Sequence, residues 1–172
     1  MGKPIREARA EVEKCATGCE FYAQHAERFL ADEVIATGAA NSYVAYQPLG
    51  TLLAIMPWNF PFWQAFRAAV PALAAGNSVL LKTASQTPLV AERFAEAAAA
   101  AGLPDAVFSY LHLDHADVPS VIQDPRVGFV AFTGGVEAGH IVQRAAGERF
   151  IATGLELGGK DPAYVRADAD LD

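Results

Sequence analysis

The sequence predicts an α/β fold in which helices cover both faces of a parallel β-sheet, with a long helix in front of it. Three observations carry this prediction. Short apolar runs alternate with longer segments of helical periodicity between residues 51 and 157. The run Thr51–Met56 is continuously apolar, as expected of a strand that is buried on both faces. Repeated strand–helix units are typical of parallel sheets whose helices lie on the two sides.

Residues 5–33 form the predicted N-terminal helix. Apolar side chains recur there at helical spacing and form one stripe, which comprises Ala8, Val12, Cys15, Cys19, Tyr22, Ala26 and Phe29. Such a stripe in a charged segment indicates an amphipathic helix. The two cysteines have no second Cys/His pair at zinc spacing, and we interpret them as reduced thiols of a cytoplasmic protein. Residues 42–47 then alternate as a half-exposed strand.

The remaining elements follow from periodicity and from glycine and proline stops. In order, we expect strand 51–56, helix 62–75, strand 78–82, helix 88–101, strand 107–111, short helix 118–123, strand 127–132, helix 134–147 and strand 151–157. Ligands of such sheets bind beyond the carboxyl ends of the strands. Candidate site residues should therefore follow Met56, Leu81, Phe132 and Leu155.

Composition narrows the classes of partner. The chain has 172 residues, 52% of them hydrophobic and 19% charged, which is enough for one domain with a buried core. Its net charge of -7 argues against binding to nucleic acid or to a membrane surface. No apolar run reaches transmembrane length, and the charged start lacks the apolar core of a signal peptide.

The segment Pro57–Pro61 follows the first buried strand and holds one polar side chain, Asn59. Two prolines restrict its backbone. An amide fixed at the ligand edge of a sheet suits hydrogen bonding to a developing oxyanion. The alternative, that Asn59 caps the helix beginning near Phe62, fits the residues equally well.

Three further segments bring polar groups to the same edge. Lys82 can bind ribose hydroxyls or a phosphate, or it can be a surface lysine whose charge reaches solvent. Gly134-Gly135 opens a helix whose free N–H groups suit a pyrophosphate, although such a pair is more often only a tight turn. Glu156 lies between two leucines, where burial would raise its pKa toward that of a general base. The alternative is a glutamate paired with a lysine or arginine.

Together these segments resemble the aldehyde dehydrogenase superfamily. The motifs are PWNFP at 57–61, LLK at 80–82, QTP at 86–88, FTG at 132–134 and LELGGKDP at 155–162. They occur in the family's order, and the resemblance extends over essentially the whole chain. It is closest to the succinate-semialdehyde dehydrogenase-like branch. The resemblance implies a Rossmann-like fold, here an incomplete cofactor-binding domain.

The resemblance also implies roles for individual residues. Asn59 would donate its amide to a thiohemiacetal oxyanion, and Glu156 would activate the water that hydrolyses the thioester. Lys82 and Ser85 would contact the adenosine ribose. The residues implied to form the cofactor site are Ile55, Met56, Pro57, Trp58, Asn59, Lys82, Ser85, Thr133, Gly134, Gly135, Glu156 and Leu157. The implied reaction oxidises a small aldehyde to the carboxylic acid with NAD or NADP.

Several departures from the family pattern carry further expectations. Ser85 stands where many members have a glutamate that repels a 2′-phosphate, so we expect NADP to be used. Gly135 replaces a serine, and the segment around Asp114 lacks the glycine-rich loop of many members. The family's nucleophilic cysteine comes later than Asp172. Residues 1–172 are therefore expected to be the NAD(P)-binding domain of a longer homodimer or homotetramer, and to be inactive alone.

Two alternative functions remain at this point. A CoA-acylating aldehyde dehydrogenase would share most of these motifs, but such relatives typically lack the hydrolytic base that Glu156 represents. A nucleotide-binding module without chemistry would share Lys82 and the glycine turn, but it would not need Asn59 and Glu156 together. Succinate semialdehyde is the substrate that the resemblance to the branch indicates.

Overall fold

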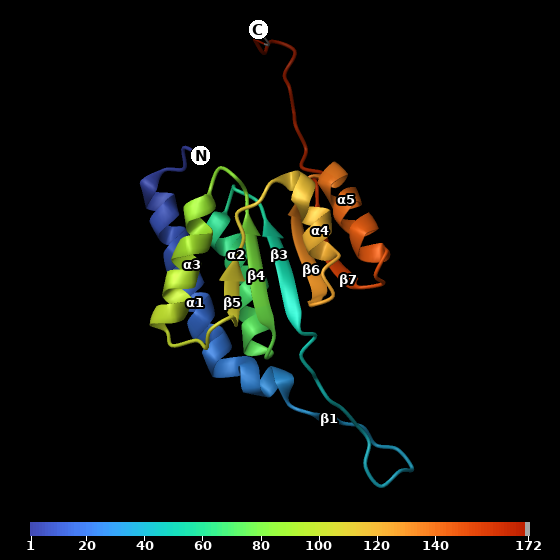
Figure 1. The fold of residues 1–172 in the computed structure, drawn as a ribbon. Coiled ribbons are helices and arrows are strands. Elements are labelled where there is room, and N and C mark those ends of the chain that lie inside the picture. The colour runs from blue at the N-terminus through green and yellow to red at the C-terminus, as the bar shows by residue number, and fades with distance from the viewer. Residues whose placement is uncertain (171–172) are drawn as a thin grey trace.

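Five parallel strands form the centre of the computed structural model, which describes residues 1–170 (Figure 1). They lie in the order β5-β4-β3-β6-β7. Their bounds are Thr51–Met56 for β3, Ser78–Thr83 for β4, Phe108–Tyr110 for β5, Val127–Gly134 for β6 and Ala152–Leu157 for β7. Every pairing between them is parallel, so the predicted fold class is confirmed.

Helices cover both faces of this sheet (Figure 1). The helices are α1 (Ile5–Leu30), α2 (Pro61–Ala74), α3 (Pro88–Ala100), α4 (Val118–Ile122) and α5 (Val136–Gly147), and a 3-10 turn covers His115–Asp117. Helices α2 and α3 pack on β3, β4 and β5, whereas α5 packs on β6 and β7 from the other side. The strand order therefore reverses between β3 and β6. In open α/β sheets this reversal opens a crevice at the carboxyl ends of the strands.

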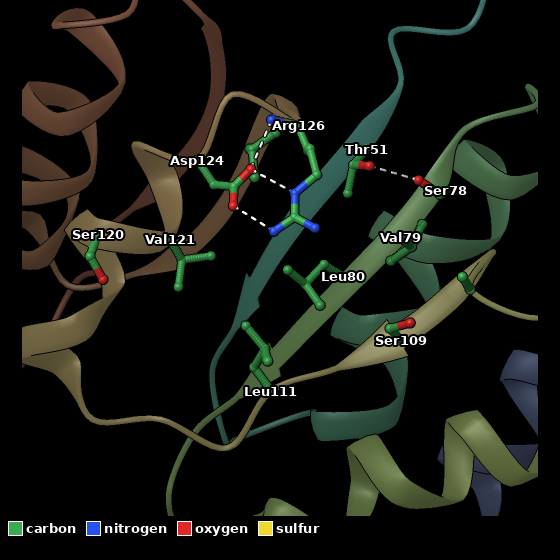
Figure 2. Close-up of a pocket in the computed structure, with 12 residues that line it drawn as sticks. Thr51, Ser78, Val79, Leu80, Ser109, Leu111, Ser120, Val121, Asp124 and Arg126 are labelled. Atoms are coloured by element: carbon green, nitrogen blue, oxygen red, sulfur yellow. Dashed lines mark hydrogen bonds and ion pairs between the residues drawn. The ribbon is translucent and has the colours of Figure 1, made fainter.

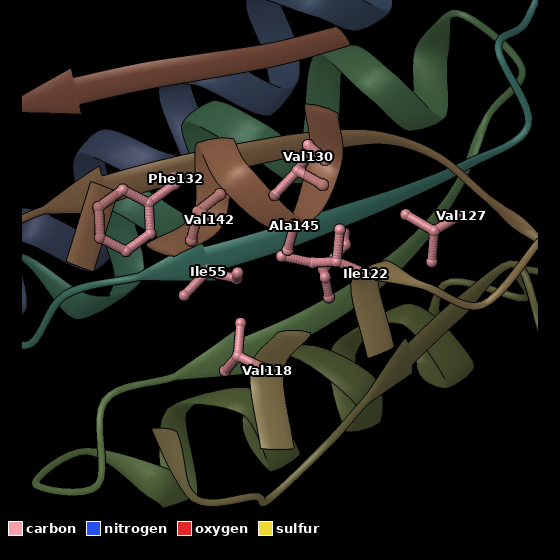
Figure 3. Close-up of a cluster of buried hydrophobic side chains, with 10 residues drawn as sticks. Ile55, Val118, Ile122, Val127, Val130, Phe132, Val142 and Ala145 are labelled. Atoms are coloured by element: carbon pink, nitrogen blue, oxygen red, sulfur yellow. The ribbon is translucent and has the colours of Figure 1, made fainter. Parts of the chain in front are cut away.

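Two hydrophobic clusters fill the space on the two sides of the sheet. Figure 3 shows the cluster between the sheet and α4 and α5, in which Ile55 lies near Val118, Val130 and Phe132. The other cluster joins Met56 and neighbouring strand residues to α2 and α3. Consecutive residues of β3 thus enter opposite cores. This explains why the run 51–56 is apolar throughout.

Helix α1 lies against α2 on the outside of the second cluster. The helices approach closely at Gly18, where an added Cβ would be 2.2 Å from the ring of Phe66. The predicted apolar stripe is wrong at Val12, Cys19 and Phe29, which are exposed. Glu11 is instead the buried residue of this helix. The prediction rested on the spacing of apolar residues, so it could not identify a buried carboxylate.

The segment after α1 differs most from the prediction. The helix ends at Leu30, and β1 (Glu33–Val34) pairs antiparallel with β2 (Tyr43–Val44) in a hairpin that extends away from the sheet (Figure 1). Strand β2 is shorter than residues 42–47 and exposed on both faces, because no second layer covers it. Among residues 1–170, no helix is long and apolar enough to cross a bilayer.

Candidate functional site

The carboxyl ends of β3, β6 and β7 converge on one hollow of the surface. A pocket of about 540 Å³ is lined by Pro57, Trp58, Asn59, Gln64, Thr133, Gly134, Glu156, Leu157 and Gly158. A second pocket of about 260 Å³ shares Gln64, Thr133 and Glu156 with it and adds Met56 and Arg67. The two hollows therefore adjoin. Seven of the predicted site residues line the larger one, and we call the two together the edge site.

Asn59 lies between β3 and α2, in the loop that begins at Pro57 and ends where Pro61 starts the helix. Its side-chain oxygen accepts a hydrogen bond from the backbone N–H of Phe60, at 3.1 Å. The amide NH2 group is thereby left available to a ligand. The alternative that Asn59 caps α2 is wrong, because Phe60 is the N-cap residue and the cap has no bond from its own side chain.

Glu156 is exposed rather than buried, with 52% of its side chain accessible. Its carboxylate forms an ion pair with Arg67 of α2, whose Nη1 donates to Oε2 at 3.0 Å. The Thr133 hydroxyl donates to the same oxygen at 3.4 Å. Hydrogen bonds from Arg67 hold the pKa of Glu156 below its ordinary value. The expected rise in pKa is therefore wrong, and the alternative of a paired glutamate is confirmed.

Replacing Arg67 by methionine should raise the pKa of Glu156. The guanidinium favours the ionised carboxylate, so its loss makes protonation easier and moves the titration to higher pH. A ¹³C NMR titration of the Glu156 carboxyl carbon measures this shift directly. Arg93→Met is the matched control, because Arg93 pairs with Glu96 on the exposed side of α3. An unchanged Glu156 titration in the Arg67 variant would contradict the assignment.

Lys82 lies near the carboxyl end of β4, the strand that pairs with β3, and so at the same edge of the sheet. It is buried, with 4% of the residue exposed, so the alternative of a surface lysine is wrong. Burial lowers its pKa, and the charge of Asp114 partly opposes that change. Its ammonium donates only a 3.3 Å bond to the carbonyl of Thr83 among the described residues. A buried cation with so little compensation is suited to an anionic or hydroxyl-rich ligand.

The other predicted cofactor residues differ in how far they are exposed to a ligand. Gly135 is the N-cap of α5 without a side-chain cap, so the first N–H groups of that helix are free for an anion. Ser85 is exposed in the turn after β4. Ile55 and Met56 bury their side chains in the two cores, although Met56 also reaches the smaller pocket. Ile55 can therefore approach a ligand only through its backbone.

Another hollow, of about 430 Å³, lies toward the amino ends of the strands (Figure 2). Figure 2 shows the ion pair of Arg126 with Asp124 and the hydrogen bond between Thr51 and Ser78 at this hollow. None of the predicted site residues line it. Within residues 1–170, no group of three or more His, Cys, Asp or Glu side chains could hold a metal ion.

Sequence reasoning missed Arg67. It is the only charged residue within the apolar segment 61–74, and that isolation was the available signal. Its partner could not be inferred, because Glu156 is 89 residues away in the chain.

Comparisons with known proteins give a consistent result. The model of the aldehyde dehydrogenase family matches residues 1–172. The chain is 51% identical over its full length to a Synechocystis protein named probable succinate-semialdehyde dehydrogenase (NADP+), and 47% identical to the succinate-semialdehyde dehydrogenase (NADP+) of Mycobacterium avium. It spans 38% and 37% of their lengths.

Solved structures agree with these matches. The succinic semialdehyde dehydrogenase of Streptococcus pyogenes, crystallised with NADP+, aligns with a TM-score of 0.90 at 37% identity. The alignment covers 99% of this chain and 37% of that one. The succinate-semialdehyde dehydrogenase of Burkholderia pseudomallei aligns with a TM-score of 0.87 at 34% identity, over 98% of this chain and 36% of that one.

Proposed function

Because the chain belongs to the aldehyde dehydrogenase family, we propose that residues 1–172 form the cofactor-binding part of an NADP-using enzyme that oxidises an aldehyde to a carboxylic acid. The observation that carries this proposal is the edge site, where Asn59 and Glu156 line one pocket beside the free N-terminus of α5. A donor for an oxyanion, a carboxylate base and an anion-binding helix end are the parts that this reaction needs from the region.

Asn59 acts as the oxyanion donor in this proposal. Attack of a thiolate on an aldehyde carbonyl places negative charge on the oxygen, and a donor already fixed in position stabilises that charge. The backbone N–H of Phe60 donates to the side-chain oxygen of Asn59 and so restricts rotation of the amide. Its NH2 group can then donate to the oxyanion without reorganisation.

Glu156 acts as the base that activates water for hydrolysis of the acyl intermediate. Its lowered pKa keeps it ionised at neutral pH, and since Arg67 is the main cause of the lowering, release of the Arg67 bonds would make Glu156 a stronger base. Arg67 and Thr133 occupy its oxygens in this arrangement, and a water must therefore compete with them or use the remaining lone pairs. The exposure of the side chain leaves room for such a water.

The residues at the neighbouring strand ends fit a dinucleotide. Bound NADP supplies the hydride acceptor of the oxidation. Lys82 would bind ribose hydroxyls or the 2′-phosphate, and the N-terminus of α5 would receive the pyrophosphate. Ser85 is uncharged and exposed, so it does not repel a 2′-phosphate. These features support NADP as the preferred cofactor, with NAD also accepted.

Arg67 supports a substrate that carries a carboxylate, such as succinate semialdehyde. Among the described residues, it is the only lysine or arginine that lines the edge site. A guanidinium binds a carboxylate by two parallel hydrogen bonds, as it does with Glu156 here. A substrate that carries an aldehyde and a carboxylate could be anchored at its acid end once Glu156 releases Arg67, while its aldehyde lies near Asn59.

We also propose a cytoplasmic homo-oligomer. Both cysteines are free thiols, which fits a reducing compartment. The hairpin of β1 and β2 exposes Val34 and Tyr43, and apolar surface of this kind fits a contact with another subunit.

A chimera tests the proposed function. In it, residues 1–172 replace the matching stretch of the Synechocystis relative, and the unmodified relative is the reference. We expect the chimera to reduce NADP in the presence of succinate semialdehyde, and to do so faster than it reduces NAD. An inactive chimera beside an active relative would contradict the proposal, and strict preference for NAD would contradict the assignment of Ser85.

The chain of 172 residues alone should show no turnover in the same assay. Neither of its cysteines lines the edge site. Both lie on α1, and burial raises the pKa of Cys15 to about 11, so this thiol stays protonated at neutral pH. Formation of NADPH by the purified chain would require a nucleophile that this account does not include.

A further inference from the structure

Glu11 is a buried carboxylate that the proposed reaction does not use. It lies in the N-terminal half of α1, and only 4% of its side chain is exposed. Burying an ionised carboxylate is unfavourable unless hydrogen bonds and an opposite charge compensate for the lost water. The identity of its partners therefore indicates what the residue does.

The first partners of Glu11 are at the start of α2. Its Oε1 accepts hydrogen bonds from the backbone N–H groups of Phe62 at 2.8 Å and of Trp63 at 3.0 Å. The first N–H groups of a helix have no partner within the helix, and the N-cap residue Phe60 provides none. A carboxylate at this end also interacts favourably with the helix dipole. Glu11 thus supplies from another helix the cap that α2 lacks.

The second partner is Lys3, whose ammonium forms an ion pair with Oε2 of Glu11. The same ammonium lies 3.4 Å from the backbone carbonyl oxygen of Asn59 and donates to it. It also lies 4.0 Å from the centre of the Phe60 ring. The pair therefore contacts the chain on both sides of the loop bend, at residues 59–60 and at residues 62–63.

We infer that Lys3 and Glu11 are positioning residues for Asn59. They hold the backbone that carries the proposed oxyanion donor, and they do so from the outer side of α2 without lining the pocket that contains Asn59. This inference rests on the proposed function of Asn59. Prolines 57 and 61 restrict the shape of the loop, and the ion pair fixes the place of the loop relative to α1.

Amide hydrogen exchange of the 172-residue chain tests the contacts themselves. Glu11→Gln removes the charge with little change of shape, and Lys3→Met removes the contact with Asn59. We expect Glu11→Gln to speed exchange at Phe62 and Trp63 by roughly 10- to 100-fold, the effect of losing a charge-assisted hydrogen bond. Exchange at Leu53 and Val130 in the central strands should not change. Glu13→Gln, an exposed neighbour on α1, is the matched control and should leave all four amides unchanged.

Kinetics of the chimera test the effect on Asn59. Glu11→Gln and Lys3→Met should each lower kcat by roughly 10-fold, less than removal of an oxyanion donor, which costs ~10²–10³-fold. The KM for NADP should stay within about twofold, because the lost interaction orients a group that acts in the transition state. Lys3→Arg should restore most of the rate, since arginine keeps the charge.

The possible results separate the two proposals. Local loss of protection at Phe62 and Trp63 together with a fall in kcat supports the inference. Unchanged amide exchange in Glu11→Gln would overturn the inference. A lower kcat in Glu11→Gln while Asn59→Ala keeps the native kcat would also overturn it. A native chimera without activity would contradict the proposed function, whereas the exchange measurement tests the Lys3–Glu11 contact in either case. If Glu11→Gln does not fold, amide exchange at Asn59, Phe60, Phe62 and Trp63 in Lys3→Met decides the question.

Discussion

Replacing Asn59 by alanine should lower kcat of the chimera by ~10²–10³-fold, the loss seen when one oxyanion donor is removed. The side chain lines the edge site, and its carbonyl is held by the backbone N–H of Phe60. The donor is therefore fixed before the reaction begins, and its removal affects mainly the state in which charge has developed. KM for the aldehyde should change much less than kcat.

Steady-state kinetics with NADP and succinate semialdehyde measure this effect, and circular dichroism verifies the fold. Asn59→Asp is a sharper variant, because it keeps the shape and places a negative charge where the oxyanion forms. It should be at least as slow as Asn59→Ala. Asn41→Ala, in the exposed segment before β2, is the matched control and should keep the full rate. Equal activity of Asn59→Ala and Asn41→Ala would remove the catalytic role.

Replacing Glu156 by glutamine should separate the two halves of the reaction. The amide cannot accept a proton from water, so hydrolysis of the acyl intermediate should slow by roughly 10²–10⁴-fold. Formation of that intermediate does not need this base. The variant should therefore release about one equivalent of NADPH per active site in a rapid burst and then turn over slowly.

Stopped-flow measurement of NADPH absorbance resolves the burst from the steady state. Glu96→Gln is the matched control, because Glu96 is likewise an exposed glutamate paired with an arginine. It should leave both phases as they are in the native chimera. Loss of the burst together with turnover in Glu156→Gln would show that the residue acts earlier. Turnover of the native chimera that requires added coenzyme A would favour the acylating alternative.

The order of elements and the location of the candidate site could be predicted from the sequence. Apolar periodicity depends on which faces of an element are buried, and this is a local property of the chain. The continuous run 51–56 thus predicted a strand buried on both sides. The carboxyl ends of such strands then located Asn59, Thr133 and Glu156 at one edge. The motifs around them were sufficient to identify the family.

Only the tertiary structure decided the pKa values, the burial and the hydrogen-bond partners of the charged side chains. The pKa of Glu156 depends on Arg67, which the packing of α2 against the sheet brings beside it from 89 residues away. Lys82 is buried together with its neighbours Leu81 and Thr83, because β4 lies inside the sheet and side chains pack on both of its faces. The burial of Glu11 could not be predicted from the spacing of apolar residues, because a buried carboxylate requires partners, and the N–H partners of Glu11 come from a distant part of the chain. The local sequence indicates which apolar residues are buried, whereas the burial and pairing of charged residues depend on strand order and helix packing.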